Sequence, residues 1–312
     1  MTIDIHTHLW VKEHFSDTWW KTSATFLSQA TSQMERSGTP QEVLEKFLPE
    51  SFDPRGEICV RLMDEAEIEK SVIMPIDCGL GLGEGSKSIE EQNRDLASVA
   101  KRYPGRFIFF CSIDPRREGA LDFLEKAVKE WDAKGFKLQP VMGQLYPWDE
   151  AAYPLYQRLS QLGLPVLTHV GPMFEPLDSK YGHPRELDRV LRDFPNLTII
   201  AAHIGYAWWR ELIEVAQKRP NLVCDFSNLQ NSANENYGRF CHVLRRVLDG
   251  FGKDRVLFGT DGPFWDPWLS RKWWVDLIKN LPTQAPEGSR FTEEEINAML
   301  YGSAQKLLAS PT

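Results

Sequence analysis

The residues best suited to chemistry are histidines and one acid at the ends of short apolar runs. The first run, IDIHTH at 3–8, places His6 and His8 two residues apart. Side chains alternate between the two faces of a strand, so both imidazoles are expected on one face, within reach of one ion. Burying two neighbouring imidazoles costs desolvation free energy unless their nitrogens are satisfied, and a divalent metal ion satisfies them well. A pair of hydrogen-bonded core histidines would give the same local pattern.

The elements that must position these residues are parallel strands, each followed by a helix. Short β-branched runs bounded by Gly, Pro or Asp alternate with stretches of helical periodicity along the chain. The eight expected strands are Thr2–His8, Ser71–Ile76, Arg106–Ile113, Gly135–Gln139, Pro165–Val170, Leu197–His203, Leu222–Ser227 and Arg255–Thr260. Eight such units predict an α/β fold of the (β/α)₈ TIM-barrel type, because a doubly wound sheet usually stops at about five to seven strands.

Further candidates lie at the ends of other expected strands. His169 ends the fifth, His203 ends the sixth and Asp261 follows the eighth. The carboxyl ends of barrel strands meet at one mouth, where TIM-barrel enzymes keep their catalytic groups. Histidines and a carboxylate around an ion with an open position are typical of a catalytic metal site, whereas structural zinc sites are more often built from cysteines. The five cysteines here are widely spaced, which favours free thiols.

Two segments depart from a minimal barrel. Residues Leu9 to Arg55 are rich in aromatic side chains and too long for an ordinary connection, so we expect them to cap the active-site mouth. We interpret residues 1–312 as a single domain, with 9–55 as its capping insertion. The second segment, DCGLGLGEGSK at 77–87, lacks the Gly-Lys-Ser/Thr ending of a phosphate-binding loop and is interpreted as a mobile lid. A last amphipathic helix is expected at Thr292–Leu308.

Composition narrows the class of partner. The 312 residues carry a formal net charge of −8, which argues against nucleic-acid binding. No apolar run approaches the roughly 18 residues that span a bilayer, and the start of the chain does not resemble a secretory signal. We therefore expect a cytoplasmic protein with a small-molecule substrate and no membrane association. With 11 tryptophans, some of which could lie on the surface, the sequence is compatible with a homodimer.

The chain resembles the amidohydrolase superfamily, and more closely its amidohydrolase-related branch of aminocarboxymuconate semialdehyde decarboxylase-like proteins. The matching segments span the chain in the order of the family: IDIHTH at 3–8, GFKLQP at 135–140, LPVLTHVG at 164–171, IIAAHIG at 199–205 and VLFGTDGP at 256–263. The closing segment INAMLYGSAQKLL departs from the family at Gly302-Ser303, where Gly-Asn or Asn-Ala is more usual. That departure concerns stability rather than the metal.

This resemblance implies roles for the candidates. The metal ligands would be His6, His8, His169 and Asp261, and the ion would be a single Zn²⁺ or Mn²⁺. The catalytic residues would be His203, which handles protons, and Asp261, which could also hold the attacking water.

Three further residues are assigned to substrate contacts: Lys137, His14 and Trp148. In several branches of the superfamily the lysine of the fourth strand is carbamylated and bridges two metals. The branch that this chain resembles is mononuclear, which favours an unmodified Lys137 able to pair with a substrate carboxylate or with Asp261.

The leading functional hypothesis is a metal-dependent hydrolase that uses metal-activated water on a C–N or C–O bond of a small carboxylate-bearing or aromatic compound. The alternative is a metal-dependent non-oxidative decarboxylase of an aromatic or unsaturated carboxylic acid. A second alternative is a non-catalytic barrel stabilised by its metal. Fold and ligands are common to all three, so the sequence leaves the choice open.

Overall fold

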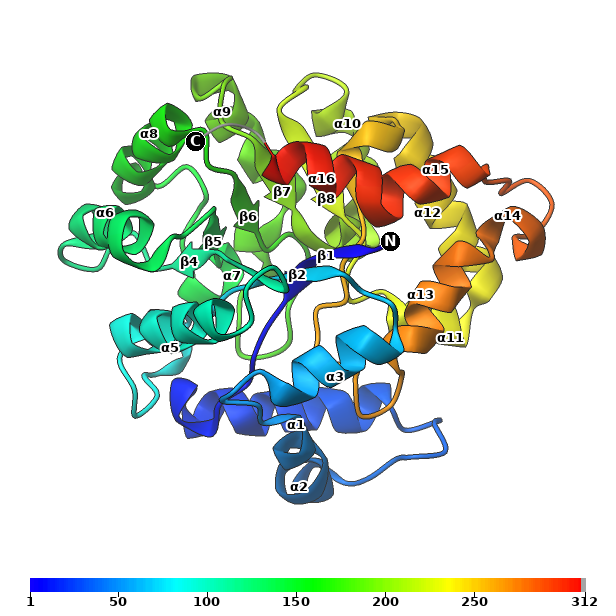
Figure 1. The fold of residues 1–312 in the computed structure, drawn as a ribbon, viewed down its shortest axis with the longest axis horizontal. Coiled ribbons are helices and arrows are strands. Elements are labelled where there is room, and N and C mark those ends of the chain that lie inside the picture. The colour runs from blue at the N-terminus through cyan, green and yellow to red at the C-terminus, as the bar shows by residue number, and fades with distance from the viewer. Residues whose placement is uncertain (310–312) are drawn as a thin grey trace.

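The computed structural model describes residues 1–309, in which a ring of parallel strands is surrounded by helices (Figure 1). All strand pairs are parallel, and the strands follow one another around the ring in chain order. The strands are β1 Ile3–Thr7, β2 Lys70–Ile73, β3 Phe107–Phe109, β4 Cys111–Ser112, β5 Phe136–Leu138, β6 Val166–Thr168, β7 Ile199–Ala201, β8 Leu222–Asp225 and β9 Val256–Leu257. The predicted TIM barrel is confirmed.

The expected third strand, 106–113, is divided into β3 and β4 at Phe110. β3 pairs with β2, and β4 pairs with β5. Between them the Phe110 N–H still donates to the Ile73 carbonyl oxygen at 3.0 Å. β3 and β4 therefore share one place in the ring, and the barrel has eight strand positions.

The ring closes between its first and last strands. The Ile5 N–H donates to the Phe258 carbonyl at 3.0 Å, and the Asp261 N–H donates to the His6 carbonyl at 2.7 Å. A parallel bridge joins Thr7 to Gly262. These hydrogen bonds place the segment that carries Asp261 directly beside the segment that carries His6.

A bulge in β1 changes the expected alternation of its side chains. Asp4 pairs with Ser71 but Thr7 pairs with Ile73, so β1 has one more residue than β2 over this stretch. Ile5 packs in the apolar cluster inside the barrel, together with the middle residues of the other strands. The next residue, His6, lines the pocket at the mouth. Two successive side chains thus face the interior, as a bulge permits.

The helices pack their apolar faces on the outside of the strands. The larger outer helices are α3 Glu57–Glu65, α5 Ile89–Arg102, α6 Ala120–Trp131, α8 Tyr153–Leu162, α9 Leu187–Asp193, α10 Trp209–Ala216, α12 Tyr237–Phe251 and α13 Arg271–Lys279. α5 shows how the sequence starts a helix: the Ser88 hydroxyl accepts from the Glu91 N–H, while the Glu91 carboxylate accepts from the Ser88 N–H. The closing helix expected at Thr292–Leu308 consists of α15 Glu293–Asn297, a π-helical turn at 298–302 and α16 Ser303–Leu308.

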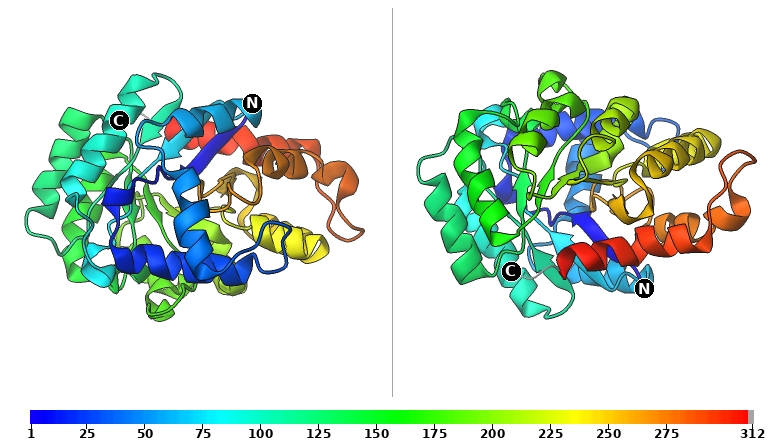
Figure 2. Two further views of the ribbon diagram at one scale, coloured as in Figure 1. Left: turned by 90° about the horizontal axis from the view of Figure 1, so that it is seen from below. Right: turned by 90° about the horizontal axis from the view of Figure 1, so that it is seen from above.

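Residues 9–55 contain α1 Asp17–Ala30, the short α2 Pro40–Glu42 and several turns. In Figure 2, left, this segment is drawn in blue across the face that is seen from below. Its aromatic side chains form an apolar cluster of their own with residues from later loops, among them Val141, Leu177 and Trp265. The segment is therefore packed onto the barrel by a second core.

The glycine-rich segment at 77–87 forms α4 Gly79–Leu82 and a packed loop. A β-carbon at Gly81 would lie 1.8 Å from the Met142 carbonyl oxygen, so glycine is needed there for close approach. Glu84 pairs with Arg117 at 2.7 Å. These glycines therefore allow close packing of the segment, and its mobility as a lid stays a prediction.

Within residues 1–309, the structure contains no helix that is both long enough and apolar enough to cross a bilayer.

Candidate metal centre

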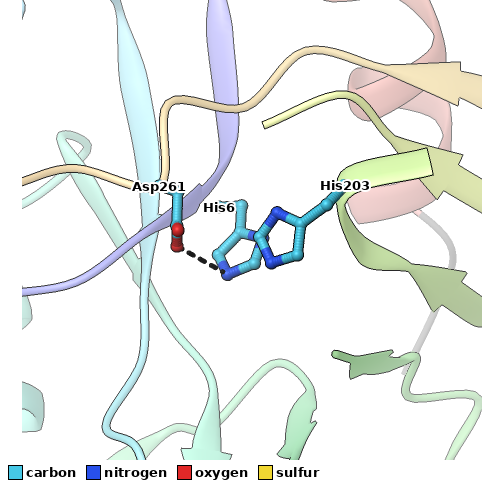
Figure 3. Close-up of side chains that lie close together, drawn as sticks. All are labelled: His6, His203 and Asp261. Atoms are coloured by element: carbon cyan, nitrogen blue, oxygen red, sulfur yellow. Dashed lines mark ion pairs between the residues drawn. The ribbon is translucent and has the colours of Figure 1, made fainter. Parts of the chain in front are cut away.

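Three ligand-type side chains meet at the mouth of the barrel. Single ligand atoms of His6, His203 and Asp261 all lie within 4.8 Å of one another (Figure 3). His6 lies in β1, while His203 and Asp261 follow β7 and β9. Asp261 Oδ1 is 3.3 Å from His6 Nε2 and 3.3 Å from His8 Nε2. The closed ring therefore brings side chains from three separate segments, at His6 and His8, at His203 and at Asp261, to one point.

A backbone carbonyl determines which nitrogen of the His8 ring carries the proton. His8 Nδ1 lies 2.8 Å from the Met74 carbonyl oxygen. A carbonyl oxygen only accepts, so Nδ1 carries the proton and the Nε2 lone pair is free to bind an ion. This is the usual state of a metal-binding imidazole.

His169 supplies a test of whether the site fits a metal. Its ring centroid is 4.9 Å from that of His203, and its Nε2 is buried with no hydrogen-bond partner among the described residues. A buried nitrogen without a partner costs free energy, and coordination to an ion would satisfy it. The donor set, imidazoles with one carboxylate, suits a divalent transition metal.

The site is held by unusual backbone conformations. His203, Asn228 and Asp261 have φ values of 61°, 61° and 52°, in the left-handed region. Residues without glycine's freedom pay of order 1 to 3 kcal/mol for such conformations, and they cluster at functional sites. The left-handed run continues from His203 to Tyr206, whose ring stacks on the His203 ring with centroids 5.0 Å apart. The chain therefore turns sharply after β7 and keeps both rings at the mouth.

Burial governs the charges of the centre. Burial lowers the pKa of His203 to about 4, so the ring is neutral at pH 7. Burial would raise the pKa of Asp261, but its interactions with His6 and His8 hold that pKa below its usual range. The Asn228 amide also donates to Asp261 Oδ2 at 2.6 Å. A carboxylate beside neutral imidazoles is the ionisation state that a metal site requires.

Lys137 lies within the same cluster. Its Nζ is 2.9 Å from His6 Nε2, and its side chain is buried. Burial lowers the pKa of Lys137 to about 8, although the negative charges of Asp261 and Asp225 act to raise it. The amine is thus at the edge of the ligand cluster, where it could pair with an anion.

A pocket of about 390 Å³ opens above the centre. The polar residues at its floor are His6, His8, Lys137, Gln139, His169, His203, Asn228 and Asp261. Its walls are largely aromatic, with Trp10, Trp19 and Phe26 from the 9–55 segment and Phe264 and Trp265 from the loop after β9. Among the described residues that line it, Lys137 is the only lysine or arginine.

Two of the residues assigned to substrate contacts lie elsewhere. His14, within the 9–55 segment, is buried with Nε2 3.3 Å from the Asp95 carboxylate. Trp148 donates its indole N–H to Glu186 at 2.6 Å and stacks on Tyr146. Neither residue lines the pocket, so the geometry gives no support to substrate contact by His14 or Trp148.

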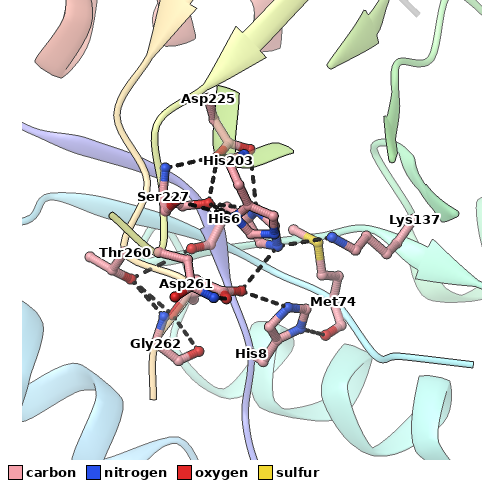
Figure 4. Close-up of polar contacts among 12 residues, drawn as sticks. His6, His8, Met74, Lys137, His203, Asp225, Ser227, Thr260, Asp261 and Gly262 are labelled. Carbon is pink, nitrogen blue, oxygen red and sulfur yellow. Dashed lines mark hydrogen bonds and ion pairs between the residues drawn. The ribbon is translucent and has the colours of Figure 1, made fainter. Parts of the chain in front are cut away.

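The sequence analysis did not identify the residues that lie behind the candidate ligands. Asp225 and Ser227, from β8 and the residues after it, contact His6 and His203 (Figure 4). The available signal was an acid inside the apolar run LVCDF at 222–226, since a buried carboxylate requires partners.

The family model described as Amidohydrolase matches residues 3–309. The chain belongs to this amidohydrolase family. Among curated proteins, Protein fluG of Emericella nidulans is 22% identical over 144 residues. That match covers 44% of this chain and 16% of fluG, so the chain spans only a small part of its relative.

Solved structures match this amidohydrolase over nearly all of its length. An uncharacterised TIM-barrel protein from Bordetella bronchiseptica is 26% identical, with a TM-score of 0.70 and coverage of 99% of this chain and 98% of that chain. A dihydroxybenzoic acid decarboxylase from Polaromonas sp., with bound manganese, is 20% identical, with a TM-score of 0.66 over 98% and 96%. An amidohydrolase from Burkholderia multivorans, with bound zinc, is 18% identical, with a TM-score of 0.65 over 100% of both chains. The last two likenesses show the shared fold.

Proposed function

We propose that the protein is a metal-dependent hydrolase that cleaves a C–N or C–O bond of a small aromatic compound. The observation that carries this proposal is the convergence of neutral imidazoles and one carboxylate on the floor of an aromatic pocket. We assign the ion to His6, His8, His169 and Asp261, and proton transfer to His203. The expected ion is a single Zn²⁺, with Mn²⁺ as the other candidate.

The residues of the chain supply the remaining requirements of hydrolysis. A divalent ion in this centre would polarise a water molecule and lower the pKa of that water towards about 7. His203, neutral because it is buried, can accept the proton that the attacking water releases and pass it to the leaving group. Asp261 can orient the water as well as hold the ion. Lys137 can pair with an anionic group of the substrate.

The aromatic walls support a planar substrate. Pockets lined by aromatic side chains with a few convergent polar groups are typical of sites for small, largely apolar ligands. Trp10, Trp19 and Phe26 all come from residues 9–55, which supports the interpretation of that segment as a cap over the active site. Closing the site with apolar rings would exclude bulk water from the reaction.

Decarboxylation is the second candidate, and Lys137 is the observation that favours it. A buried lysine next to the ligand cluster, beneath aromatic walls, could pair with the carboxylate of an aromatic acid. The relative from Polaromonas sp. is a dihydroxybenzoic acid decarboxylase. In this reaction His203 or a water would help to protonate the carbon that loses carbon dioxide.

One experiment separates the candidates. The purified protein is stripped of metal, reloaded with Zn²⁺ or Mn²⁺, and incubated with aryl esters, lactones, anilides and hydroxylated benzoic acids. We expect one metal per chain and metal-dependent cleavage of an ester, lactone or amide. Release of carbon dioxide from the benzoic acids alone would establish the second candidate instead. Stable metal binding without turnover of any compound would favour the non-catalytic, metal-stabilised barrel.

A further inference from the structure

Asp225 is a fully buried carboxylate behind the candidate centre. Its Oδ2 lies 3.1 Å from His6 Nδ1, on the side of the ring away from Asp261. On the other side of the same ring, Lys137 Nζ lies 2.9 Å from His6 Nε2. An ammonium group only donates, so Nε2 accepts and Nδ1 carries the proton that Asp225 receives. His6 is therefore held as the tautomer whose Nε2 lone pair faces the pocket.

Ser227 extends this contact to a second ring. Its hydroxyl oxygen is 2.5 Å from Asp225 Oδ1, 2.9 Å from His203 Nδ1 and 3.1 Å from His6 Nδ1. A serine hydroxyl has one proton, and an ionised carboxylate can only accept. That proton therefore goes to Asp225, and the hydroxyl oxygen accepts from the imidazoles.

A contact with the backbone also indicates that His203 is protonated on Nδ1. Its Nδ1 lies 3.2 Å from the Ser227 carbonyl oxygen, which can only accept. Asp225 Oδ1, which receives the Ser227 hydroxyl proton, also accepts from the His203 N–H at 3.2 Å and from the Ser227 N–H at 3.0 Å. These bonds hold the left-handed turn that begins at His203. Both the ring and its backbone are thus fixed by two residues at the end of β8.

We propose that Asp225 and Ser227 are positioning residues that hold His6 and His203 in the Nδ1–H tautomer, so that the Nε2 lone pair of His6 is available to the ion and that of His203 is available to accept a proton. The inference rests on the proposed metal centre, but the tautomers belong to the metal-free protein and can be measured there. Partners behind metal-binding imidazoles typically contribute about 10 to 100-fold to metal affinity. Here one carboxylate and one hydroxyl serve two rings.

The first test is a measurement of histidine tautomers in the metal-free protein. ¹⁵N-labelled histidine gives distinct long-range couplings for the two tautomers, and the His6 and His203 signals are identified from H6Q and H203Q variants. We expect Nδ1–H for both rings near pH 7.5. The Asp225→Asn variant can donate to His6 Nδ1 through its amide, so it should populate the Nε2–H form of His6. Nε2–H tautomers in the wild type would overturn the proposal.

The second test is metal affinity, measured by competition with a chromophoric zinc chelator. We expect about a 10 to 100-fold loss for Asp225→Asn and about a threefold to tenfold loss for Ser227→Ala, in which the carbonyl at 227 still accepts from His203. Ser71→Ala is the matched control, because Ser71 is a buried serine whose hydroxyl has no hydrogen-bond partner among the described residues. Its affinity should stay within twofold of the wild type.

Failure of the positioning role and failure of the proposed function would give different results. Affinities of Asp225→Asn and Ser227→Ala within twofold of the wild type would overturn the positioning role. Should Asp225→Asn fail to fold, the wild-type tautomers and the affinity of Ser227→Ala decide the same question. A wild-type protein that shows the expected tautomers but binds neither Zn²⁺ nor Mn²⁺ would overturn the proposed function and leave the assignment of the two rings standing.

Discussion

The floor and the walls of the pocket are built by different forces. At the floor, His8 donates to a carbonyl, and His6 and His203 meet Asp225 and Ser227, so directed hydrogen bonds fix the rings. The walls rest on contacts between aromatic rings, such as the Trp10 and Trp19 rings, whose centroids are 5.5 Å apart. Hydrogen bonds specify atoms, whereas apolar packing specifies shape and volume. We therefore expect the floor to determine the reaction and the walls to determine the substrate.

The largest expected effect comes from the floor. His203→Asn should lower turnover by about 10²- to 10⁴-fold, because the proton acceptor is lost, while metal content stays near one equivalent. Turnover and metal analysis of the same preparation test this. His242→Asn is the matched control, since His242 is exposed on α12, and it should keep wild-type turnover. Survival of activity in His203→Asn would remove its proton-transfer role.

A change at Lys137 should act on binding. Lys137→Gln removes the cation of the floor and is expected to raise the KM of an anionic substrate by about 10 to 100-fold, with a smaller change in kcat. The same protein should hold one metal per chain, like the wild type. Intact mass of the wild type should show no carbamate. A carbamate on Lys137 together with two metals per chain would contradict the mononuclear site.

Burial of His203 at the floor should make the stability of the metal-free protein depend on pH. The unfolded chain takes up a proton on His203 as the pH falls through about 6.5, whereas the folded chain resists protonation down to about 4. Lower pH therefore favours unfolding. Between about pH 7 and pH 5 this residue should lower the free energy of unfolding by about 2 kcal/mol. Denaturant unfolding at both pH values should show a smaller loss for His203→Asn. An equal loss in both proteins would contradict the low pKa.

Substitutions in the walls should affect turnover less than substitutions in the floor. Phe26→Ala removes one pocket-lining ring of α1 and is expected to raise KM about tenfold for an aromatic substrate, with kcat within about threefold. Thr25→Ala, at an exposed position of the same helix, serves as control and should leave both constants unchanged. A loss of kcat as large as that of His203→Asn would show that floor and walls are not separate in function.

The barrel and the residues at its mouth could be predicted because both depend on local patterns. Apolar runs mark the strands, and the barrel rule brings His169, His203 and Asp261 to the same end. The bulge in β1 could not be predicted, since it depends on the register between Asp4 and Ser71. Asp225 lies inside an apolar run, and its partners come from strands distant in sequence.

His14 shows a different limit. Its position on the 9–55 segment suggested contact with substrate, but position along a chain does not say which side of the segment a side chain faces. The ring contacts Asp95, on α5, and does not line the pocket. Only the packing of the segment on the barrel settles that direction.

The hydrogen bonds between β1 and the residues after β9 have a consequence for assembly. His6 and His8 come from the beginning of the chain and Asp261 from near its end, and they meet only when the last strand docks beside the first. A chain truncated before Asp261 would keep the histidines of the candidate centre but lack its carboxylate. Under the proposed function, metal binding would require a closed ring, and fragments or permutants that leave this junction open are expected to bind no ion.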